Sequence, residues 1–415
     1  MKGRGLVISA PSSGAGKTTV TLGLLRALRE ITAVKPAKSG PDYIDPAFHE
    51  AACGVPSVNL DAWAMTQEQM LSLAATRDLL VIEGAMGLFD GAPPDGLGST
   101  ADVAKALGLP VILVVDARAM SQSIAALVRG FREHDAAVQV AGVILNRVGS
   151  PRHEAMLRGA LARLGVSVLG ALPRSDEISL PSRHLGLVQA REHGDLDATL
   201  ERMAALIRAH VDLTALTNLA ASFEASPNFK RRGSRRIALA EDAAFSFTYA
   251  FKRHHWWRDD LVLPFSPLAD DPVPEADLVI LPGGYPELHA NNLSRADKFK
   301  FSLREAAQSI DIYGECGGYM ALGEALVDAD GVSHEMAGLL PLVTSFAARK
   351  LHLGYRRLKA HNSSQQWRGH EFHYATTLRA DGTPAFDAWD AEGNALGPIG
   401  LVEGRVSGSF AHIIA

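Results

Sequence analysis

Cysteine is almost absent from this sequence. Among its 415 residues there are only two, Cys53 and Cys316, and they lie far apart. A disulfide framework or a cysteine-based zinc site needs cysteines at short, regular spacings, so the sequence excludes both. A chain with so little cysteine suits a reducing compartment, and we expect it in the cytoplasm.

Long apolar runs are missing too. A helix that crosses a bilayer needs roughly 20 apolar residues, whereas runs such as 110–115 are only long enough for buried strands. The first residues, Met1 to Arg4, lead within a few apolar positions into a Gly/Ser loop and lack the apolar centre of a secretory signal. We therefore expect a soluble protein that is neither exported nor anchored in a membrane.

An excess of charge of one sign is also absent. The chain has 41 Lys and Arg against 46 Asp and Glu, a formal net charge of −5, which gives no reason to expect nucleic acid as a partner. Hydrophobic residues make up 47% and charged residues 21%, as in folded proteins without long disordered tracts. The length allows two or three domains, each with its own core.

Short β-branched runs alternate with longer helical stretches along the chain. In the first half we expect strands and helices in the order 5–10, 18–30, 79–82, 111–115, 121–134, 140–145 and 153–164. This alternation predicts a parallel, doubly wound α/β sheet. Three later runs predict strands of a second α/β unit, at 237–240, 278–281 and 310–313.

The alternation breaks down between Asp212 and Arg236, where Thr, Asn, Ser and Pro precede a basic run at 230–236. We interpret this run as part of a solvated linker; the alternative is a segment that binds an anionic substrate. The predicted organisation is a first domain at 1–212, a linker at 213–236 and a second domain at 237–415.

A phosphate-binding loop is predicted near the N-terminus. The expected strand at 5–10 runs into Pro11-Ser12-Ser13-Gly14-Ala15-Gly16-Lys17-Thr18-Thr19, and a helix follows, which is the context of a nucleotide-binding P-loop. Gly14 and Gly16 allow backbone N–H groups to surround phosphate oxygens. Lys17 is expected to reach the terminal phosphates and Thr18 to bind Mg²⁺. A chance Gly/Ser turn is the alternative, because Pro11 replaces the usual first glycine.

Two acidic segments supply carboxylates for such a site. One, at 40–46, contains Asp42 and Asp45, and the other, at 83–91, contains Glu83 and Asp90. Glu83 directly follows an expected strand, and the carboxyl ends of parallel strands border the ligand crevice of these sheets. We expect Thr18, Asp45 and Glu83 to bind Mg²⁺, and three aspartates to act in catalysis: Asp42, Asp45 and Asp90. Turn formation beside Pro and Gly is the alternative for the aspartates.

A cysteine nucleophile is predicted near the C-terminus. The strand at 310–313 ends in Gly314-Glu315-Cys316-Gly317-Gly318, and 319–326 has a helical pattern. G-x-C-x-G on a strand-to-helix turn is the cysteine form of the nucleophile elbow. The glycines relieve crowding, and the helix N-terminus is expected to favour the thiolate of Cys316. An inert buried thiol is the alternative, and it is our interpretation of Cys53, which lacks flanking glycines.

Such a nucleophile needs oxyanion donors and a proton carrier. Gly283 and Gly284, after another expected strand, could donate backbone N–H groups together with Gly317. A histidine must move the proton. The spacing does not choose among six candidates: His289, His352, His361, His370, His373 and His412.

Seven motifs are spread over nearly the whole length of the chain, at 10–19, 40–46, 83–91, 181–187, 281–287, 314–318 and 369–374. Through these motifs the chain resembles the a,c-diamide synthases of cobalamin biosynthesis, which amidate cobyrinic or hydrogenobyrinic acid. It implies an N-terminal synthetase domain like dethiobiotin synthetase and a C-terminal class I glutamine amidotransferase domain with a flavodoxin-like fold. Pro11 in the phosphate loop is normal for this family.

The resemblance also selects the catalytic histidine. The family's Ser-aromatic-x-His motif falls on 409–412 and points to His412. Class I glutaminases usually carry a glutamate two residues later to orient the histidine, but this chain has Ile414, and the cobalamin branch likewise lacks that glutamate. The orienting group is therefore left open. The basic pair Lys35 and Lys38 is expected to face the polycarboxylate substrate.

The implied function is an ATP- and glutamine-dependent ligase. Its partners would be a corrinoid polycarboxylate, ATP and L-glutamine, with Mg²⁺ as cofactor; a homodimer is left open. ATP would convert the a and c carboxylates into acyl phosphates, which ammonia released at Cys316 would attack. Of the two acids, we expect hydrogenobyrinic rather than cobyrinic acid.

Two other functions are considered. One is an amidoligase of another tetrapyrrole, cobyric acid or a nickel sirohydrochlorin. The other is a P-loop switch ATPase of the partition type. A switch of that type has a second lysine early in its phosphate loop, where this chain has 11–13, and it would leave Cys316 without a role.

Overall fold

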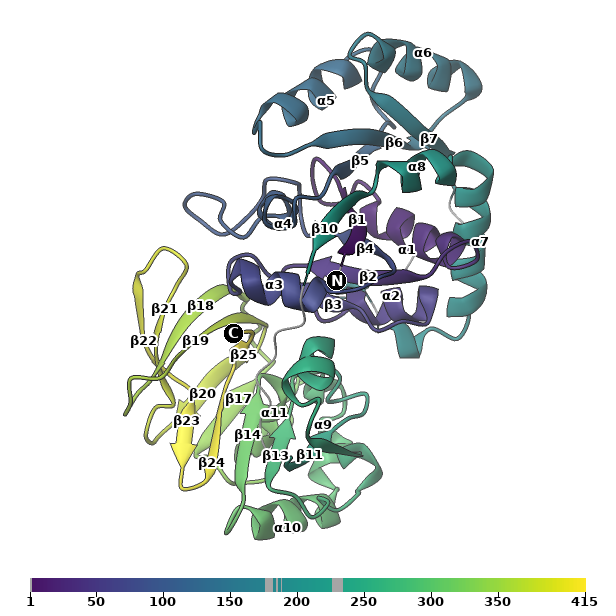
Figure 1. Ribbon diagram of the computed structural model, residues 1–415. Helices are drawn as coiled ribbons and strands as arrows, with labels where there is room; N and C mark the ends of the chain where they lie inside the picture. The colour runs from purple at the N-terminus through teal and green to yellow at the C-terminus, as the bar shows by residue number, and fades with distance from the viewer. Residues whose placement is uncertain (1, 176–181, 184–185, 188, 226–233) are drawn as a thin grey trace. The chain divides into compact units, whose positions relative to one another are not determined.

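The computed structural model describes residues 2–175, 182–183, 186–187, 189–225 and 234–415. The chain forms two compact units, Met1–Asn228 and Phe229–Ala415, and the division falls inside the expected linker. Each unit contains a mainly parallel sheet with helices beside it (Figure 1). The α/β class predicted from the alternation of runs is therefore confirmed.

The first unit is built on a sheet whose parallel strands follow the order β3-β2-β4-β1-β5-β6-β7. Strands β1, β4 and β5 are almost entirely buried, as expected for strands covered on both faces. The bounds are β1 (Lys2–Ser9), β2 (Val34–Ser39), β3 (Val58–Leu60), β4 (Leu79–Glu83), β5 (Val111–Asp116), β6 (Val140–Val148) and β7 (Ser167–Pro173).

Helices connect these strands and cover the sheet: α1 (Lys17–Leu28), α2 (Asp45–Cys53), α3 (Gln67–Ala74), α4 (Thr100–Leu107), α5 (Ile124–Glu133), α6 (Pro151–Ala162) and α7 (Leu196–His210). Local sequence sets several helix starts, since Ser99 and Asp102 form a capping box at α4. Helix α1 packs against α7 (Figure 1). A Cβ on Gly23 would lie 2.7 Å from Cγ1 of Ile207, so this approach requires glycine.

The first part of the expected linker is ordered structure of the first unit. Residues 213–224 form α8 (Leu213–Leu219) and β10 (Ala221–Glu224), and β10 pairs antiparallel with the start of β1. A four-residue strand is too short to show a period, and the partner that stabilises it is more than 200 residues away in the sequence. Most of the basic run, 230–233, lies outside the described residues.

The second unit has a six-stranded sheet in the order β12-β11-β13-β14-β24-β23, parallel except for β23. Its strands are β11 (Arg236–Ala240), β12 (Leu261–Phe265), β13 (Leu278–Leu281), β14 (Asp311–Glu315), β23 (Leu401–Glu403) and β24 (Val406–Ser409). The helices are η2 (Lys252–Trp256), η3 (Pro267–Ala269), η4 (Pro286–Leu288), α9 (Ala290–Ser294), α10 (Asp297–Ala306) and α11 (Gly317–Leu322).

Two smaller, mainly antiparallel sheets complete the second unit. One contains β15 (Ala325–Val327), β16 (Ser333–Glu335), β17 (Leu342–Ser345) and β20 (Thr376–Ala380). The other contains β18 (His352–Ala360), β19 (Gln366–His373), β21 (Phe386–Trp389), β22 (Ala395–Ile399) and β25 (His412–Ile413). The prediction of a helix at 319–326 was wrong at its C-terminal end. Extended backbone at Gly323 ends α11, and the chain continues into β15.

The motif at 181–187 is only partly described. Its four described residues form the short antiparallel strands β8 (Ser182–Arg183) and β9 (Gly186–Leu187), shortly before η1 (Ala190–Glu192). The rest of that motif lies outside the described residues.

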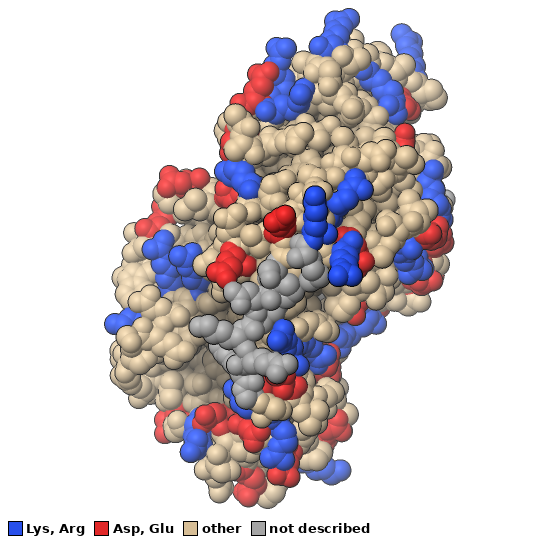
Figure 2. All heavy atoms as spheres, viewed as in Figure 1, with Lys and Arg blue, Asp and Glu red and all other residues tan. Residues whose placement is uncertain are grey.

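On the face shown in Figure 2, basic and acidic side chains are intermixed over both units. In the part of the chain that the structure describes, the helices are too short or too polar to cross a bilayer.

Candidate active sites

The phosphate loop between β1 and α1 has the backbone that its glycines predict. Gly14 and Gly16 have φ angles of 79° and 88°, a region that glycine adopts at little cost. A Cβ on Gly16 would also lie 2.2 Å from Nδ2 of Asn146. Helix α1 begins at Lys17, and the free N–H groups of its first turn, which includes Thr19, border the loop. This arrangement suits an anion such as a nucleotide phosphate.

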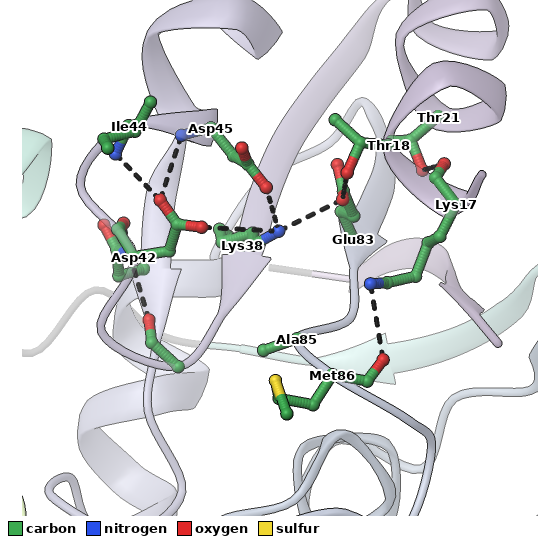
Figure 3. A network of polar contacts seen from close by, with 12 residues as sticks. Lys17, Thr18, Thr21, Lys38, Asp42, Ile44, Asp45, Glu83, Ala85 and Met86 are labelled. Atoms are coloured by element: carbon green, nitrogen blue, oxygen red, sulfur yellow. Dashed lines mark hydrogen bonds and ion pairs between the residues drawn. The ribbon is translucent and has the colours of Figure 1, made fainter. Parts of the chain in front are cut away.

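Thr18 and Glu83 meet at the edge of this loop (Figure 3). Glu83 ends β4 and is fully buried, and the Thr18 hydroxyl donates a hydrogen bond of 2.6 Å to its Oε1. Lys17 donates to the carbonyl of Met86 at 3.4 Å, and burial lowers the pKa of its ammonium. Lys17 thus places a cation beside the phosphate loop, and Thr18 and Glu83 place oxygen atoms there that can bind a metal ion.

The donor set fits Mg²⁺. This ion prefers oxygen ligands and usually takes only one or two carboxylates besides phosphate and water. Thr18 and Glu83 provide such oxygens, and Asp45 lies in the same network. Among the described residues there is no group of three or more His, Cys, Asp or Glu side chains that could hold a metal ion. A site completed by nucleotide phosphates is consistent with both observations.

Lys38 lies at the centre of the acidic cluster (Figure 3). Its Nζ is 3.0 Å from Oε1 of Glu83 and 3.8 Å from Oδ2 of Asp42, and it donates to Asp45. Burial opposes its charge, but the three carboxylates outweigh burial and raise the pKa of Lys38. Burial and the neighbouring Asp42 raise the pKa of Asp45, although Lys38 opposes this. One ammonium thus holds three carboxylates together.

Lys35 does not share this cluster. Positions 35 and 38 are an odd number of residues apart on β2, so their side chains leave opposite faces of the strand. The Lys35 ammonium donates instead to the carbonyls of Leu73 and Ala75 at the end of α3, at 2.7 and 3.1 Å. The two lysines therefore do not act as a pair on one face of β2, and contact of Lys35 with the substrate stays a prediction.

Asp42 and Asp90 both have the turn contacts that were the alternative to catalysis. Asp42 accepts from the N–H groups of Ile44 and Asp45 at 2.8 and 3.0 Å, at the start of α2. Asp90 accepts from the N–H of Gly87 at 2.8 Å, and this turn follows β4 beside the phosphate loop. Of these two aspartates, only Asp42 also has a described contact with Lys38. Turn formation and catalysis do not exclude each other at these positions.

Residues that the sequence did not single out complete the first site. His49 is buried on α2 and lies 2.7 Å from Oε2 of Glu83 through Nε2, while its Nδ1 is 3.0 Å from the Ser57 hydroxyl. Asn146 donates to the carbonyl of Ala15 at 2.9 Å, and Arg147 to that of Gly14 at 2.8 Å. Asn146 and Arg147 lie near the carboxyl end of β6, and this position could have identified them as site residues. No local sequence pattern relates His49 to Glu83.

The second site is centred on Cys316, between β14 and α11. Its φ and ψ are 47° and −102°, a strained combination for a residue with a side chain. A Cβ on Gly318 would lie 1.9 Å from the carbonyl oxygen of Leu281, so the turn needs glycine there. Cys316 is 2% exposed. The strained turn that G-x-C-x-G predicts is therefore present.

The protonation state of Cys316 differs from the expectation. Burial raises the pKa of the thiol, and the nearby carboxylate of Glu287 raises it further. Helix α11 has only six residues and does not outweigh this burial. Cys316 is thus a thiol at neutral pH and needs a base when it attacks.

Close backbone approaches connect the Cys316 turn with the two expected oxyanion glycines and with His412. A Cβ on Gly317 would be 2.9 Å from the backbone N of Gly284, so the two expected oxyanion residues are neighbours. A Cβ on Gly283 would be 3.0 Å from Nε2 of His412. The N–H of Cys316 donates to the carbonyl of Ser409 at 2.8 Å, which ties the nucleophile to the segment that carries the histidine.

Two of the other candidate histidines have partners outside this group, whereas His370 is opposite His412 in the pairing of β19 with β25. His373 lies 3.0 Å from Oε1 of Glu371, and His361 lies 2.8 Å from Oδ1 of Asp387. Sequence reasoning also did not assign a role to Glu315 and Lys252, which form a buried ion pair of 2.7 Å next to Cys316.

Known proteins resemble both units. The family model for a CobB/CobQ-like glutamine amidotransferase domain matches residues 236–415, and the model for a CobQ/CobB/MinD/ParA nucleotide binding domain matches residues 6–188. The chain is 53% identical over 430 residues to a hydrogenobyrinate a,c-diamide synthase of Rhodobacter capsulatus, with 99% of both chains covered. Proteins of the same name from Brucella anthropi and Rhizobium meliloti are 53% and 52% identical, covering 99% of this chain and 98% and 99% of theirs.

Solved structures match single parts of the chain. A glutamine amidotransferase from Thermotoga maritima is 15% identical, with a TM-score of 0.31, and covers 44% of this chain and 76% of its own.

Proposed function

This chain belongs to the hydrogenobyrinate a,c-diamide synthase family, and from that premise we propose that it uses ATP and glutamine to amidate the a and c carboxylates of hydrogenobyrinic acid. The family predicted from the seven sequence motifs is thereby confirmed. The full-length identity of 53% to a protein of that name is the observation that carries the proposal.

In the first unit, we infer that a substrate carboxylate attacks the γ-phosphorus of ATP. The bond to the bridging oxygen breaks, and ADP and an acyl phosphate result. Backbone N–H groups around Gly14 and Gly16, with the Lys17 ammonium, stabilise the phosphate charge as it shifts. Thr18, Asp45 and Glu83 would hold Mg²⁺, which neutralises phosphate oxygens. Lys38 keeps the acidic side chains in place.

In the second unit, the Cys316 thiol attacks the side-chain amide carbon of glutamine. His412 takes the thiol proton and delivers it to the departing ammonia, while the N–H groups of Gly284 and Gly317 stabilise the oxyanion. Water then hydrolyses the thioester to glutamate. Ammonia attacks the acyl phosphate and releases inorganic phosphate, and a second cycle amidates the other carboxylate.

The test is to supply ATP, Mg²⁺ and glutamine labelled with ¹⁵N in its side-chain amide, with hydrogenobyrinic or cobyrinic acid in separate reactions. We expect hydrogenobyrinic acid to gain two labelled nitrogens with two ADP formed, and cobyrinic acid to gain none. Two nitrogens on cobyrinic acid alone would move the substrate to the cobalt-containing acid. No amidation of either acid would overturn the proposal and reopen the cobyric acid and nickel sirohydrochlorin alternatives.

A partition-type switch is not favoured. Such a protein needs only nucleotide binding, and it would leave the strained Cys316 turn and His412 of the second unit without a role.

A further inference from the structure

The second unit lacks a carboxylate where a class I glutaminase usually has one. The position two residues after His412 is Ile414, which is 1% exposed and apolar. A base that takes a proton from a buried thiol must hold a fixed orientation, and its cationic form must be stabilised. Another group has to supply both effects.

Glu315, the residue that directly precedes Cys316, lies close to the side chain of His412. Its Oε2 lies 3.7 Å from Nδ1 of His412, and both side chains are buried, with 4% and 0% exposed. This is ion-pair distance, about 0.5 Å longer than a hydrogen bond. Cross-strand pairing explains the approach: Glu315 is opposite Ser409, and the chain reaches His412 three residues later.

The Glu315 carboxylate is held from two further directions. The ammonium of Lys252 lies 2.7 and 2.9 Å from its two oxygens, and the N–H of Ile413 donates to Oε1 at 3.2 Å. Lys252 is itself buried, with Nζ 5.6 Å from the centre of the Tyr249 ring and 5.9 Å from that of Trp256. Burial opposes ionisation, but Lys252 outweighs it and keeps the pKa of Glu315 at about 2. Glu315 is therefore a carboxylate at neutral pH.

We propose that Glu315, held by Lys252, is the positioning residue of His412 and takes the role of the carboxylate that position 414 lacks. It favours the tautomer with a proton on Nδ1, which leaves Nε2, on the side of Gly283, to accept the thiol proton. It also stabilises the imidazolium that forms. This inference rests on the proposed glutaminase function of the second unit.

The titratable side chains described close to this pair include Lys252, Tyr249, Tyr313 and Cys316, and also His370, which is opposite His412 in the pairing of β19 with β25. Burial raises the pKa of Tyr313 and Cys316, so both keep their protons at neutral pH. A carboxylate beside Nδ1 stabilises the imidazolium that forms during catalysis, so its removal should slow proton transfer rather than weaken glutamine binding.

The test is Glu315→Gln in the full chain. We expect kcat for glutamine hydrolysis to fall by about 10²- to 10⁴-fold, with little change in KM. Ammonia-dependent amidation should stay normal, which would show that the protein is folded. The matched control is Glu241→Gln, which removes a carboxylate paired with Arg253, the residue after Lys252, and should leave both activities unchanged.

A buried lysine without its partner can prevent folding. If ammonia-dependent amidation is lost in Glu315→Gln, the double variant Glu315→Gln/Lys252→Met is tested instead of the single variant, because it leaves no unpaired buried charge. The same loss of kcat with little change in KM is then expected. Glutamine hydrolysis at the parent rate, or a rise in KM with kcat unchanged, would overturn the role of Glu315. Loss of glutamine hydrolysis in Cys316→Ala, measured in parallel, tests the glutaminase function separately.

Discussion

Single side chains in this protein owe their properties to burial and to one or two charged neighbours. Glu83 shows this clearly, because it is fully buried and contacts a hydroxyl, an ammonium and an imidazole from three different elements. Burial opposes its charge, yet Lys38 and His49 keep its pKa well below the usual value. A buried carboxylate that stays ionised beside a phosphate loop suits a magnesium ligand.

We predict that Glu83→Gln weakens the response to magnesium. The amide keeps the shape of the side chain but removes the charge, so the Mg²⁺ concentration for half-maximal ammonia-dependent amidation should rise at least about 10-fold. Titration of Mg²⁺ at saturating ATP measures this. Glutamine hydrolysis in the second unit serves as the control for folding. An unchanged magnesium response would assign the ion to other ligands.

We predict that Cys316→Ser separates the two activities. Glutamine-dependent amidation should fall by at least about 10³-fold, because the thiol releases ammonia but takes no part in activating the carboxylate. Ammonium salts should restore product at a rate near that of the parent protein, measured by mass spectrometry. Lys17→Ala is the opposite control and should lose amidation from both nitrogen sources. If ammonia fails to rescue Cys316→Ser while ATP binding persists, the cysteine is structural.

At the scale of elements, the hairpin of β18 and β19 is held by a charged network as well as by its backbone ladder. Arg356 is opposite Gly369, which makes Glu371 its diagonal neighbour on the same face, at 2.6 Å from Nε to Oε2. His373 contributes a second contact to Glu371. Burial opposes the charge of Glu371, but these partners hold its pKa at about 2, below the ordinary 4.5.

This network predicts a pH dependence of stability. Because the pKa of Glu371 is lower in the folded state, its stabilisation is complete above pH 4.5 and is lost as the pH falls towards 2. The shift corresponds to at most about 3 kcal/mol. Glu371→Gln should therefore lower the melting temperature clearly at pH 7 and much less at pH 3, measured by calorimetry.

The control is Glu335→Gln, since the Glu335 side chain is 71% exposed and its contact with Arg304 at the surface is worth little. This variant should melt like the parent protein at both pH values. An equal loss of stability in Glu371→Gln at pH 7 and pH 3 would contradict the assigned ion pair.

Elements also differ in how far the sequence foretold them. The strands at β5 and β13 were predicted within one residue of their bounds, because each is a continuous β-branched run. Helix α7 and strands β15 to β22 were not foreseen. Many of these strands have only three to five residues, and their pairing partners lie on other parts of the chain. A short strand carries too little periodicity to be recognised before its partner is known.

At the scale of the whole molecule, the chain consists of two units with separate cores, Met1–Asn228 and Phe229–Ala415. The core of the second unit surrounds Cys316 with residues of that unit, including Leu281 and Tyr319. The acidic cluster around Lys38 is likewise complete within the first unit. Each unit thus contains the residues that we assign to its own chemistry.

We predict that the two units can be produced separately. The fragment Met1–Asn228 should unfold cooperatively and bind ATP, measured by calorimetry, because its sheet includes β10 and needs no strand from the other unit. A shorter fragment that ends at residue 212 is the control. It lacks α8 and β10, leaves part of β1 unpaired, and should melt at a lower temperature. Equal melting temperatures would contradict the role of β10.

The sequence by itself determined the local features of this protein and its family. Glycine positions predicted the phosphate loop and the strained turn at Cys316, since backbone strain at positive φ acts within a few residues. The alternation of strand and helix patterns predicted the α/β class. The motifs at both ends of the chain predicted the a,c-diamide synthase family, which the relatives then confirmed.

Only the tertiary structure decided which charges meet. Lys38 rather than Lys35 faces Glu83, 45 residues away, because the register of β2 and β4 places them side by side. The N–H of Ile413 reaches Glu315 across 98 residues, because β14 pairs with β24. No local pattern relates such positions. Burial then sets their protonation states, since the energy of a charge depends on groups that the fold brings within a few ångströms.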